Sequence, residues 1–357
     1  MKIKEALKKL LEMDGSDLFF RAGGVPRIKL GNKVLPLGDK VLKLDEVVEA
    51  VEDITTPAQR EQFKNNLDID FALFLEELSH RFRVSIFMQR NWPSIVIRNV
   101  RSSVATFEEL NLPAVVLKKL SLETRGLILL TGSMGSGKST TIASMIEHIN
   151  TNAQKHILTI EEPAEFTFQD KNCIINQREL GADVSSYPMA LRAFTLQSPD
   201  VLFIGNIRDY DTMSAALTAA ETGVLVLSTL HTINAAQTVE RVVNFFPPHQ
   251  HQQIRLQLSY LLKGVVSLRL LPIKGKTDRI PAYEIMLLTP TISRLIREGK
   301  TWEIPQYIEE GQIFGMQSFT QSLVKLVKED KIDEEVAGNY ADNRDEFLLS
   351  LRGIKKT

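Results

Sequence analysis

The chain has 357 residues, of which 43% are hydrophobic and 24% charged, as in an ordinary soluble globular protein of two domains. Its formal net charge of −1 argues against a protein that grips nucleic acid over a broad basic face. Its single cysteine excludes an internal disulfide framework and a four-cysteine zinc module. No apolar run is long enough to span a bilayer, and residues 1–11 predict an amphipathic helix rather than a signal peptide, so we expect a cytoplasmic protein without direct membrane insertion.

Residues 1–100 predict a small α+β domain. Two helices are expected at 44–51 and 57–65. Short alternating segments between Gly- and Pro-containing turns predict strands at 18–21, 27–30, 34–37, 68–74, 80–90 and 94–98. The polar residues 101–108 then predict a linker.

From residue 109 to residue 290, apolar strands alternate with helices, which predicts a doubly wound α/β sheet. The expected strands are 127–130, 157–160, 173–177, 201–204, 224–227 and 265–270. Residues 291–357 predict a helical C-terminal segment. Its expected helices are 291–299, 303–311, 318–329, 332–340 and 344–351.

One segment matches the phosphate-binding pattern G-x-x-x-x-G-K-[ST] at every fixed position. It reads Gly132-Ser133-Met134-Gly135-Ser136-Gly137-Lys138-Ser139, follows the apolar strand 127–130, and leads into a helix through Thr140. Backbone N–H groups and a helix N-terminus converge on phosphate oxygens in such a loop, Lys138 reaches the β- and γ-phosphates, and the Ser139 hydroxyl ligates Mg²⁺. A Gly-rich turn with an incidental lysine is the alternative, but the context predicts binding of a nucleoside triphosphate.

Polar side chains follow the next strands of the predicted sheet. Glu161 and Glu162 end the second core strand, where carboxylates could order Mg²⁺ or a water, although a solvated acidic loop is the alternative. Asn206 stands where a Walker-B acid is expected, and its amide can hold a water but cannot take its proton. Arg208 and Asp209 follow it and could pair with each other.

His231 comes just past the strand 224–227, where it could sense a γ-phosphate or be a structural histidine. Four arginines, Arg81, Arg83, Arg90 and Arg98, lie on predicted strands of the first domain. Surface arginines usually solvate a face, but these could instead supply arginine fingers to the nucleotide of a neighbouring subunit.

Together, these residues resemble the type IV pilus retraction ATPases, the PilT/PilU-like branch of the secretion ATPase superfamily, almost from end to end. The matching segments are Ser16-Asp17-Leu18, Asp70-Phe71, Arg81-Phe82-Arg83-Val84, Phe107-Glu108-Glu109-Leu110, Ile160-Glu161-Glu162-Pro163, Pro199-Asp200 to Arg208-Asp209, and Ser228-Thr229-Leu230-His231-Thr232. The helix from Thr291 to Glu298 and the signature Gly315-Met316-Gln317 resemble retraction members rather than assembly or type II secretion members.

This resemblance implies a PAS-like N-terminal domain, a RecA-like P-loop ATPase core and a ring-shaped homo-hexamer that uses ATP and Mg²⁺. Arg83 and Arg98 lie outside the predicted nucleotide-binding domain, so we expect them to act as arginine fingers in trans. It also implies a cytoplasmic ring that docks on the inner-membrane platform protein of the pilus machine, where a paralogous retraction ATPase is a further candidate partner.

The chain departs from the family pattern around the expected hydrolytic site. The Walker-B glutamate of the family corresponds to Asn206, and its Asp-box aspartate to Glu162. Its Arg-Glu-Asp before Pro199 corresponds to Leu196-Gln197-Ser198, and the first histidine of its His box to Val224. We interpret these as several changes around one site that retain the nucleotide pocket and weaken hydrolysis.

Three functions therefore stay open. The first is an ATPase motor that couples hydrolysis to pilus disassembly and uses Glu161 or Glu162 to handle the attacking water. The second is a slow or inactive nucleotide-binding ring subunit that assists a true retraction ATPase. The third, a RecA-like DNA translocase, is disfavoured by the near-zero charge and by the lack of an aromatic-rich basic tract, so no stable nucleic-acid partner is expected.

Overall fold

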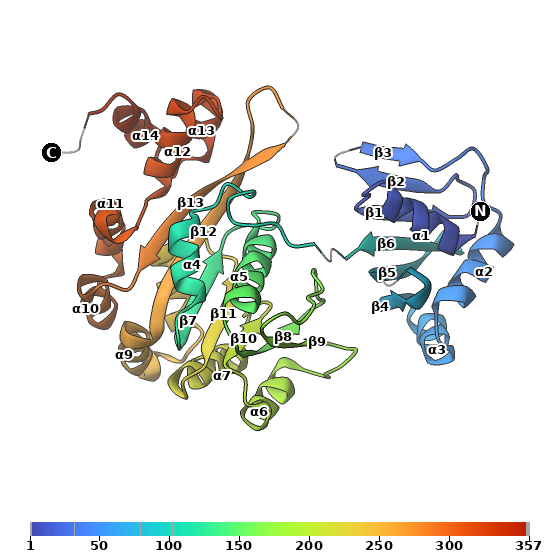
Figure 1. Ribbon diagram of the computed structural model, residues 1–357, viewed down its shortest axis with the longest axis horizontal. Helices are drawn as coiled ribbons and strands as arrows, with labels where there is room; N and C mark the ends of the chain where they lie inside the picture. The colour runs from blue at the N-terminus through green and yellow to red at the C-terminus, as the bar shows by residue number, and fades with distance from the viewer. Residues whose placement is uncertain (1, 32, 79, 101–102, 277, 355–357) are drawn as a thin grey trace. The chain divides into compact units, whose positions relative to one another are not determined.

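A computed structural model of the chain describes residues 2–31, 33–78, 80–100, 103–276 and 278–354. Arg101 and Ser102, in the predicted linker, lie outside the described residues. The chain divides into two compact units, residues 1–103 with 163–167, and residues 104–162 with 168–357. Figure 1 shows the elements of both units, and each unit is described by itself.

The first unit is the predicted small α+β domain. Within its described residues, an antiparallel sheet has the strand order β3-β2-β1-β6-β5-β4. The strands are β1 (Asp17–Arg21), β2 (Arg27–Leu30), β3 (Lys33–Pro36), β4 (Asp68–Leu75), β5 (His80–Gln89) and β6 (Trp92–Asn99). The helices are α1 (Ile3–Glu12), α2 (Leu44–Ile54) and α3 (Pro57–Asn66). Apolar residues of α1 and α2 share one buried core with alternate residues of β1, β5 and β6, so these two helices cover one face of the sheet.

The second unit holds the predicted α/β core. Its sheet has the strand order β13-β12-β7-β11-β10-β8-β9 among the described residues. The strands are β7 (Gly126–Thr131), β8 (His156–Glu161), β9 (Ile174–Glu179), β10 (Val201–Ile204), β11 (Leu225–Leu230), β12 (Leu262–Pro272) and β13 (Arg279–Leu287). The strands from β7 to β12 run parallel, and β13 returns antiparallel to β12. β13 was not predicted, so the sheet is mixed at this edge rather than wholly parallel.

Helices cover both faces of this sheet, as expected of a doubly wound core (Figure 1). The helices are α4 (Ala114–Ser121), α5 (Lys138–Asn152), α6 (Tyr187–Gln197), α7 (Tyr210–Glu221), α8 (Ala235–Asn244) and α9 (His251–Leu261). α4 and α5 share a core with Ile128 and Leu130, whereas α7, α8 and α9 share another with Leu127 and Leu129. Because successive residues of β7 point to opposite faces, these two cores lie on opposite sides of the sheet. Phe107, predicted to lie in the linker, is buried in the first of them.

The C-terminal segment is helical, as predicted. Its helices are α10 (Pro290–Glu298), α11 (Ile304–Glu310), α12 (Phe319–Lys328), α13 (Glu334–Tyr340) and α14 (Arg344–Leu351). Phe319 of α12 and Phe347 of α14 pack with Leu271 of β12 and Ile280 of β13 in a separate core. The β12–β13 hairpin therefore joins the main sheet to the last helices. No helix in the described part of the chain is long and apolar enough to cross a membrane.

Candidate nucleotide-binding site

The phosphate loop lies between β7 and α5, in the order that the motif requires. β7 ends at Thr131, and α5 begins at Lys138 after Gly137, whose φ is 97°. Gly132 has a φ of +142°, and a Cβ there would lie 2.4 Å from the Leu268 carbonyl oxygen and 2.5 Å from Ser136 Oγ. Only glycine fits position 132, because the strand beside it and the loop itself fill the space.

Lys138 lies inside this loop. Its side chain is 7% exposed, and its ammonium group donates hydrogen bonds to the carbonyl oxygens of Gly132 (2.8 Å) and Ser133 (2.9 Å). Ser139 and Thr140 follow in the first turn of α5, where the helix N-terminus favours negative charge. A hydroxyl oxygen such as that of Ser139 is a hard donor of the kind that Mg²⁺ prefers, so the residues fit a nucleotide with its metal ion.

The parallel register brings the other predicted residues to the same edge of the sheet. Leu230 pairs with Thr131, so His231 follows β11 beside the start of the loop. Ile204 pairs with both Ser228 and Ile160, which places Asn206 just beyond the end of β10 and Glu161 at the end of the neighbouring β8. The sheet therefore brings the loop, His231, Asn206 and Glu161 together in the strand order β7-β11-β10-β8.

Asn206 and His231 are in direct contact. The Asn206 amide nitrogen lies 3.4 Å from His231 Nε2, and Asn206 Oδ1 is buried without a hydrogen-bond partner among the described residues. Burial, and then the positive charges of Lys138 and Arg208, lower the pKa of His231, so its imidazole is neutral at pH 7. This pair can orient a water or a phosphate oxygen by hydrogen bonds, but the amide cannot take a proton.

The two glutamates at the end of β8 have different surroundings. Glu161 is buried, and its Oε1 accepts hydrogen bonds from the Thr159 hydroxyl (2.7 Å) and the Gln177 amide (3.3 Å). Glu162 is more exposed and forms an ion pair with Arg208 at 3.2 Å. Glu161 is therefore held inside the fold by hydrogen bonds, whereas Glu162 is partly open to solvent and paired with Arg208.

Arg208 and Asp209, which could have paired with each other, have other partners. Asp209 caps α7, and its Oδ1 accepts a hydrogen bond from the Thr212 backbone N–H at 2.8 Å. The cap holds this carboxylate at the start of α7. Arg208 pairs instead with Glu162, which follows the neighbouring strand β8.

Tyr187, which was not predicted, also reaches the site from the start of α6. Its hydroxyl is buried, and it lies 3.5 Å from the place that a Cβ on Gly205 would occupy. Burial, and then the negative charge of Glu162, raise the pKa of Tyr187 to about 12, so the phenol keeps its proton. No sequence pattern could have found it, because it lies outside the strand ends that carry the motifs.

Two of the departures from the family pattern do not surround this site. Val224 directly precedes β11, where its carbonyl oxygen accepts from the Gly126 N–H at the start of β7. Leu196 is 88% exposed in the last turn of α6, just before β10 begins. Both lie at the amino edge of the sheet, about 20 Å along the strands from the phosphate loop. The expectation that all the departures gather around one site within a subunit is therefore wrong, and Asn206 and Glu162 are the ones at the phosphate edge.

Arg83 and Arg98 lie on one face of the first unit. The register of β5 and β6 places them directly opposite each other, and β1 places Asp17 opposite Arg98. Arg98 Nε donates to the buried Asp17 Oδ1 at 3.0 Å, while 63% of the Arg98 side chain stays exposed. Phe82 and Val84 point to the other face, into the core, so both arginines face away from the domain interior.

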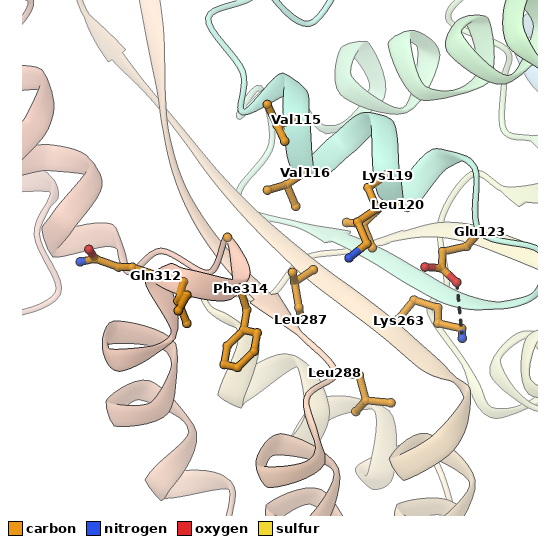
Figure 2. Close-up of a pocket in the computed structure, with 12 residues that line it drawn as sticks. Val115, Val116, Lys119, Leu120, Glu123, Lys263, Leu287, Leu288, Gln312 and Phe314 are labelled. Carbon is orange, nitrogen blue, oxygen red and sulfur yellow. Dashed lines mark ion pairs between the residues drawn. The ribbon is translucent and has the colours of Figure 1, made fainter.

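A pocket of about 520 Å³ lies away from the phosphate loop, between α4, the end of β13 and residues 312–315 (Figure 2). An ion pair between Lys263 and Glu123, at 3.5 Å, lines one end of this pocket (Figure 2). Glu123 precedes β7 and Lys263 begins β12, so the pocket is at the amino edge of the sheet. Gly315, from the signature that resembles retraction members, is in its wall.

Glu284 is a buried carboxylate on β13. In the sheet, β12 separates β13 from β7, the strand that leads into the phosphate loop. Its Oε1 accepts hydrogen bonds from the Ala235 N–H (2.7 Å) and the Ser267 hydroxyl (3.5 Å), and the Thr131 hydroxyl donates to Ser267 Oγ (3.0 Å). Burial raises the pKa of Glu284 from 4.5 to about 7, with the negative charge of Asp342 adding to the effect. The Ala235 N–H and the positive charge of Arg269 act in the opposite direction.

This shift predicts a pH-dependent stability. The folded protein holds a proton on Glu284 that the unfolded chain releases, so the contribution is complete below pH 4.5 and is lost as the pH rises through about 7. Glu284→Gln lacks this proton and keeps both hydrogen bonds. Relative to this variant, we expect the wild-type free energy of unfolding to fall by about 1 kcal/mol between about pH 6 and pH 8. Urea unfolding at the two pH values measures this change in the free energy of unfolding. The exposed Glu334→Gln is a control and should follow the wild type. A constant difference between wild type and Glu284→Gln would contradict the prediction.

Comparison with known proteins adds family information to this geometry. A family model described as type II/IV secretion system protein matches residues 65–277. The type IV pilus ATPase PilU of Pseudomonas aeruginosa is 38% identical over 352 residues, 99% of this chain and 92% of that protein. The type IV pilus retractation ATPase PilT of the same organism is 39% identical over 347 residues, 97% of this chain and 100% of that protein. A crystal structure of the pilus retraction motor PilT with bound ADP matches with a TM-score of 0.89 and 38% identity, over 97% of this chain and 98% of that one.

Proposed function

The chain belongs to the type II/IV secretion system protein family and is a PilT/PilU-like P-loop ATPase, and on this basis we propose that it is an ATP-binding ring subunit of a type IV pilus retraction machine. In this role it couples ATP hydrolysis to pilus disassembly and so supports twitching motility. The observation that most supports the proposal is the phosphate loop, with the buried Lys138 inside it, at the same sheet edge as His231 and Asn206.

Each residue of the site has a part in the proposed reaction. Residues 132–140 bind the phosphates through backbone N–H groups, and Lys138 leaves the loop carbonyls to bind the β- and γ-phosphates. Ser139 holds Mg²⁺, which neutralises charge on the phosphate oxygens when it is bound with ATP. His231 and Asn206 orient the γ-phosphate and the attacking water.

Hydrolysis in this site is weakened rather than lost. Asn206 replaces the expected base with a group that cannot take a proton, and a missing general base typically costs a factor of about 10²–10⁴ in rate. Glu162, the more exposed carboxylate, is a candidate for the proton of the water, although Arg208 occupies one of its oxygens. Glu161 is held by Thr159 and is better placed to fix the site than to exchange protons with solvent.

The proposed assembly is a homo-hexamer on the cytoplasmic side of the inner membrane. The chain covers nearly the full length of PilU and PilT, which supports the same kind of machine. We infer that the ring reaches the membrane only through the platform protein of the pilus machine, and that a paralogous retraction ATPase is a further partner.

A second function is favoured by Asn206 itself. The chain is then a catalytically impaired accessory subunit, which binds ATP and assists a partner retraction ATPase. Steady-state ATP turnover by the purified protein, alone and mixed with such a partner, separates the two. Turnover by the protein alone supports the motor, whereas turnover that rises only in the mixture supports the accessory subunit. A protein that neither binds ATP nor changes the turnover of a partner would contradict both.

The arginine fingers give a test of the ring. Arg83→Ala subunits keep the phosphate loop, and Lys138→Ala subunits keep the arginines, so mixed rings contain some sites with both. We expect each variant alone to be inactive and the mixture to regain part of the wild-type turnover. Arg90→Ala, in the turn between β5 and β6, is the matched control and should retain activity. A mixture as inactive as its components would contradict fingers in trans, and Arg98→Ala should behave as Arg83→Ala does.

A further inference from the structure

The loop that carries His231 is held at its far end by two side chains of the β12–β13 hairpin. The loop runs from His231 to Asn234, and the Asn234 side chain caps α8. Arg269 on β12 donates a hydrogen bond from Nη2 to the Ile233 carbonyl oxygen at 3.4 Å. Glu284 on β13 accepts from the Ala235 N–H at 2.7 Å. The position of His231 beside the phosphate loop therefore depends on the hairpin as well as on β11.

The same Arg269 guanidinium contacts the C-terminal helices. Its Nη1 donates to the Tyr340 carbonyl oxygen at the end of α13 at 2.5 Å, and its Nη2 pairs with Asp342 at 2.5 Å. Its Cζ lies 3.7 Å from the centre of the Phe319 ring of α12. Only 16% of the side chain is exposed. One fixed guanidinium thus contacts α12, the segment between α13 and α14, and the His231 loop.

The chemistry of this position requires arginine. A planar guanidinium offers five N–H donors in a rigid fork and can stack on an aromatic ring at the same time. A lysine ammonium would keep the charge beside Asp342 but could not reach two backbone carbonyls and a carboxylate in one plane. Arg269→Lys therefore removes the link between the two regions while it retains the charge.

We propose that Arg269 is a positioning residue that fixes the His231 loop and couples the C-terminal helices α12–α14 to the nucleotide site. The coupling rests on the proposed role of His231 in hydrolysis. A change in the segment 340–342 therefore alters the position of the His231 loop, because it alters the bonds that hold Arg269 against Ile233. By linkage, nucleotide bound at the phosphate loop changes the affinity of a contact on these helices by the same factor as that contact changes the affinity for nucleotide.

The first experiment measures amide hydrogen exchange of the full-length protein. Arg269→Lys and Asp342→Asn should each raise exchange in residues 232–238 at least about threefold, because the loop loses its anchor. Lys274→Ala is the matched control: it removes the ion pairs with Asp330 and Asp333, which lie beside the same helices, and leaves the loop untouched. Equal exchange in this loop for the Arg269 variant and the control would overturn the proposal.

The second experiment separates positioning from general stability. Arg269→Lys should lower kcat for ATP at least about threefold and leave KM within about twofold, because the phosphate loop is unchanged. In a double-mutant cycle, Arg269→Lys should have no further effect on kcat in a His231→Ala background. Additive effects on kcat would mean that Arg269 acts on turnover independently of His231 and would overturn the coupling. If His231→Ala alone leaves kcat unchanged, the proposed role of His231 and the coupling that rests on it are both wrong. If His231→Ala slows the enzyme and Arg269→Lys does not, the coupling alone is wrong.

Discussion

Replacement of Lys138 by alanine is expected to weaken the binding of a fluorescent ATP analogue at least about a hundredfold, measured by anisotropy titration of the full-length protein. The lysine is the cation of the loop that lies inside the cradle, and 7% of it is exposed. Its ammonium now donates to two loop carbonyls, so it can be transferred to phosphate oxygens without a large conformational change. The variant loses a charge-assisted hydrogen bond to a multiply charged ligand, which is among the strongest single contacts in such a site.

The control is Lys119→Ala, an exposed lysine of α4 in the same unit, which should bind as the wild type does. Thermal unfolding of both variants shows whether the loop change also affects the fold, because Gly132 and Ser133 lose a donor in the Lys138 variant. Unchanged affinity in a folded Lys138→Ala protein would contradict the assignment of the phosphate loop.

The sequence could predict the phosphate edge because each of its parts is local. The motif from Gly132 to Ser139 specifies a strand, a tight turn and a helix start, and the apolar runs specify the strands beside it. Parallel strands carry their following residues to one edge, so Glu161, Asn206 and His231 could be expected together from the sequence alone. The contact of Asn206 with His231 follows from this arrangement.

Strand pairing and edge positions were harder to predict. β13 was missed because it follows β12 directly through a hairpin turn, without a helix between the two strands. It therefore does not repeat the strand–helix alternation of the core, and α10 begins soon after it at Pro290. Val224 and Leu196 were assigned to the site by correspondence with a family motif, which gives no position along a strand. The structure places both at the opposite edge of the sheet.

Contacts between residues far apart in the sequence could not be predicted at all. Arg208 pairs with Glu162 rather than with its neighbour, and Tyr187 reaches the site from a helix start that carries no motif. The bond of Arg269 with Asp342 joins residues 73 positions apart. Such contacts depend on which side chains the folded sheet brings together, and no periodic pattern records them.

Replacement of Asn206 by glutamate is expected to raise steady-state ATP hydrolysis at least about tenfold, within the range that a general base supplies. The side chain lies at the phosphate edge, within 3.4 Å of His231, and Asn206 Oδ1 is buried without a partner in the part of the chain that the structure describes. A carboxylate there could take the proton of the attacking water, while Lys138 and Ser139 keep their contacts with the nucleotide.

Asn206→Gln is the matched control, because glutamine has the same length as glutamate and no basic oxygen. It should hydrolyse ATP no faster than the wild type, which separates the effect of the base from the effect of the extra methylene.

Adding Val224→His or Leu196→Arg to Asn206→Glu should give little further gain in ATP hydrolysis within a subunit, because both positions lie at the amino edge of the sheet. A further gain that appears only in assembled rings would place these two residues at the site of a neighbouring subunit. If the wild type already hydrolyses ATP as fast as Asn206→Glu, the site is not weakened, and Glu162 is then the carboxylate that takes the proton, since it is the more exposed of the two at the end of β8.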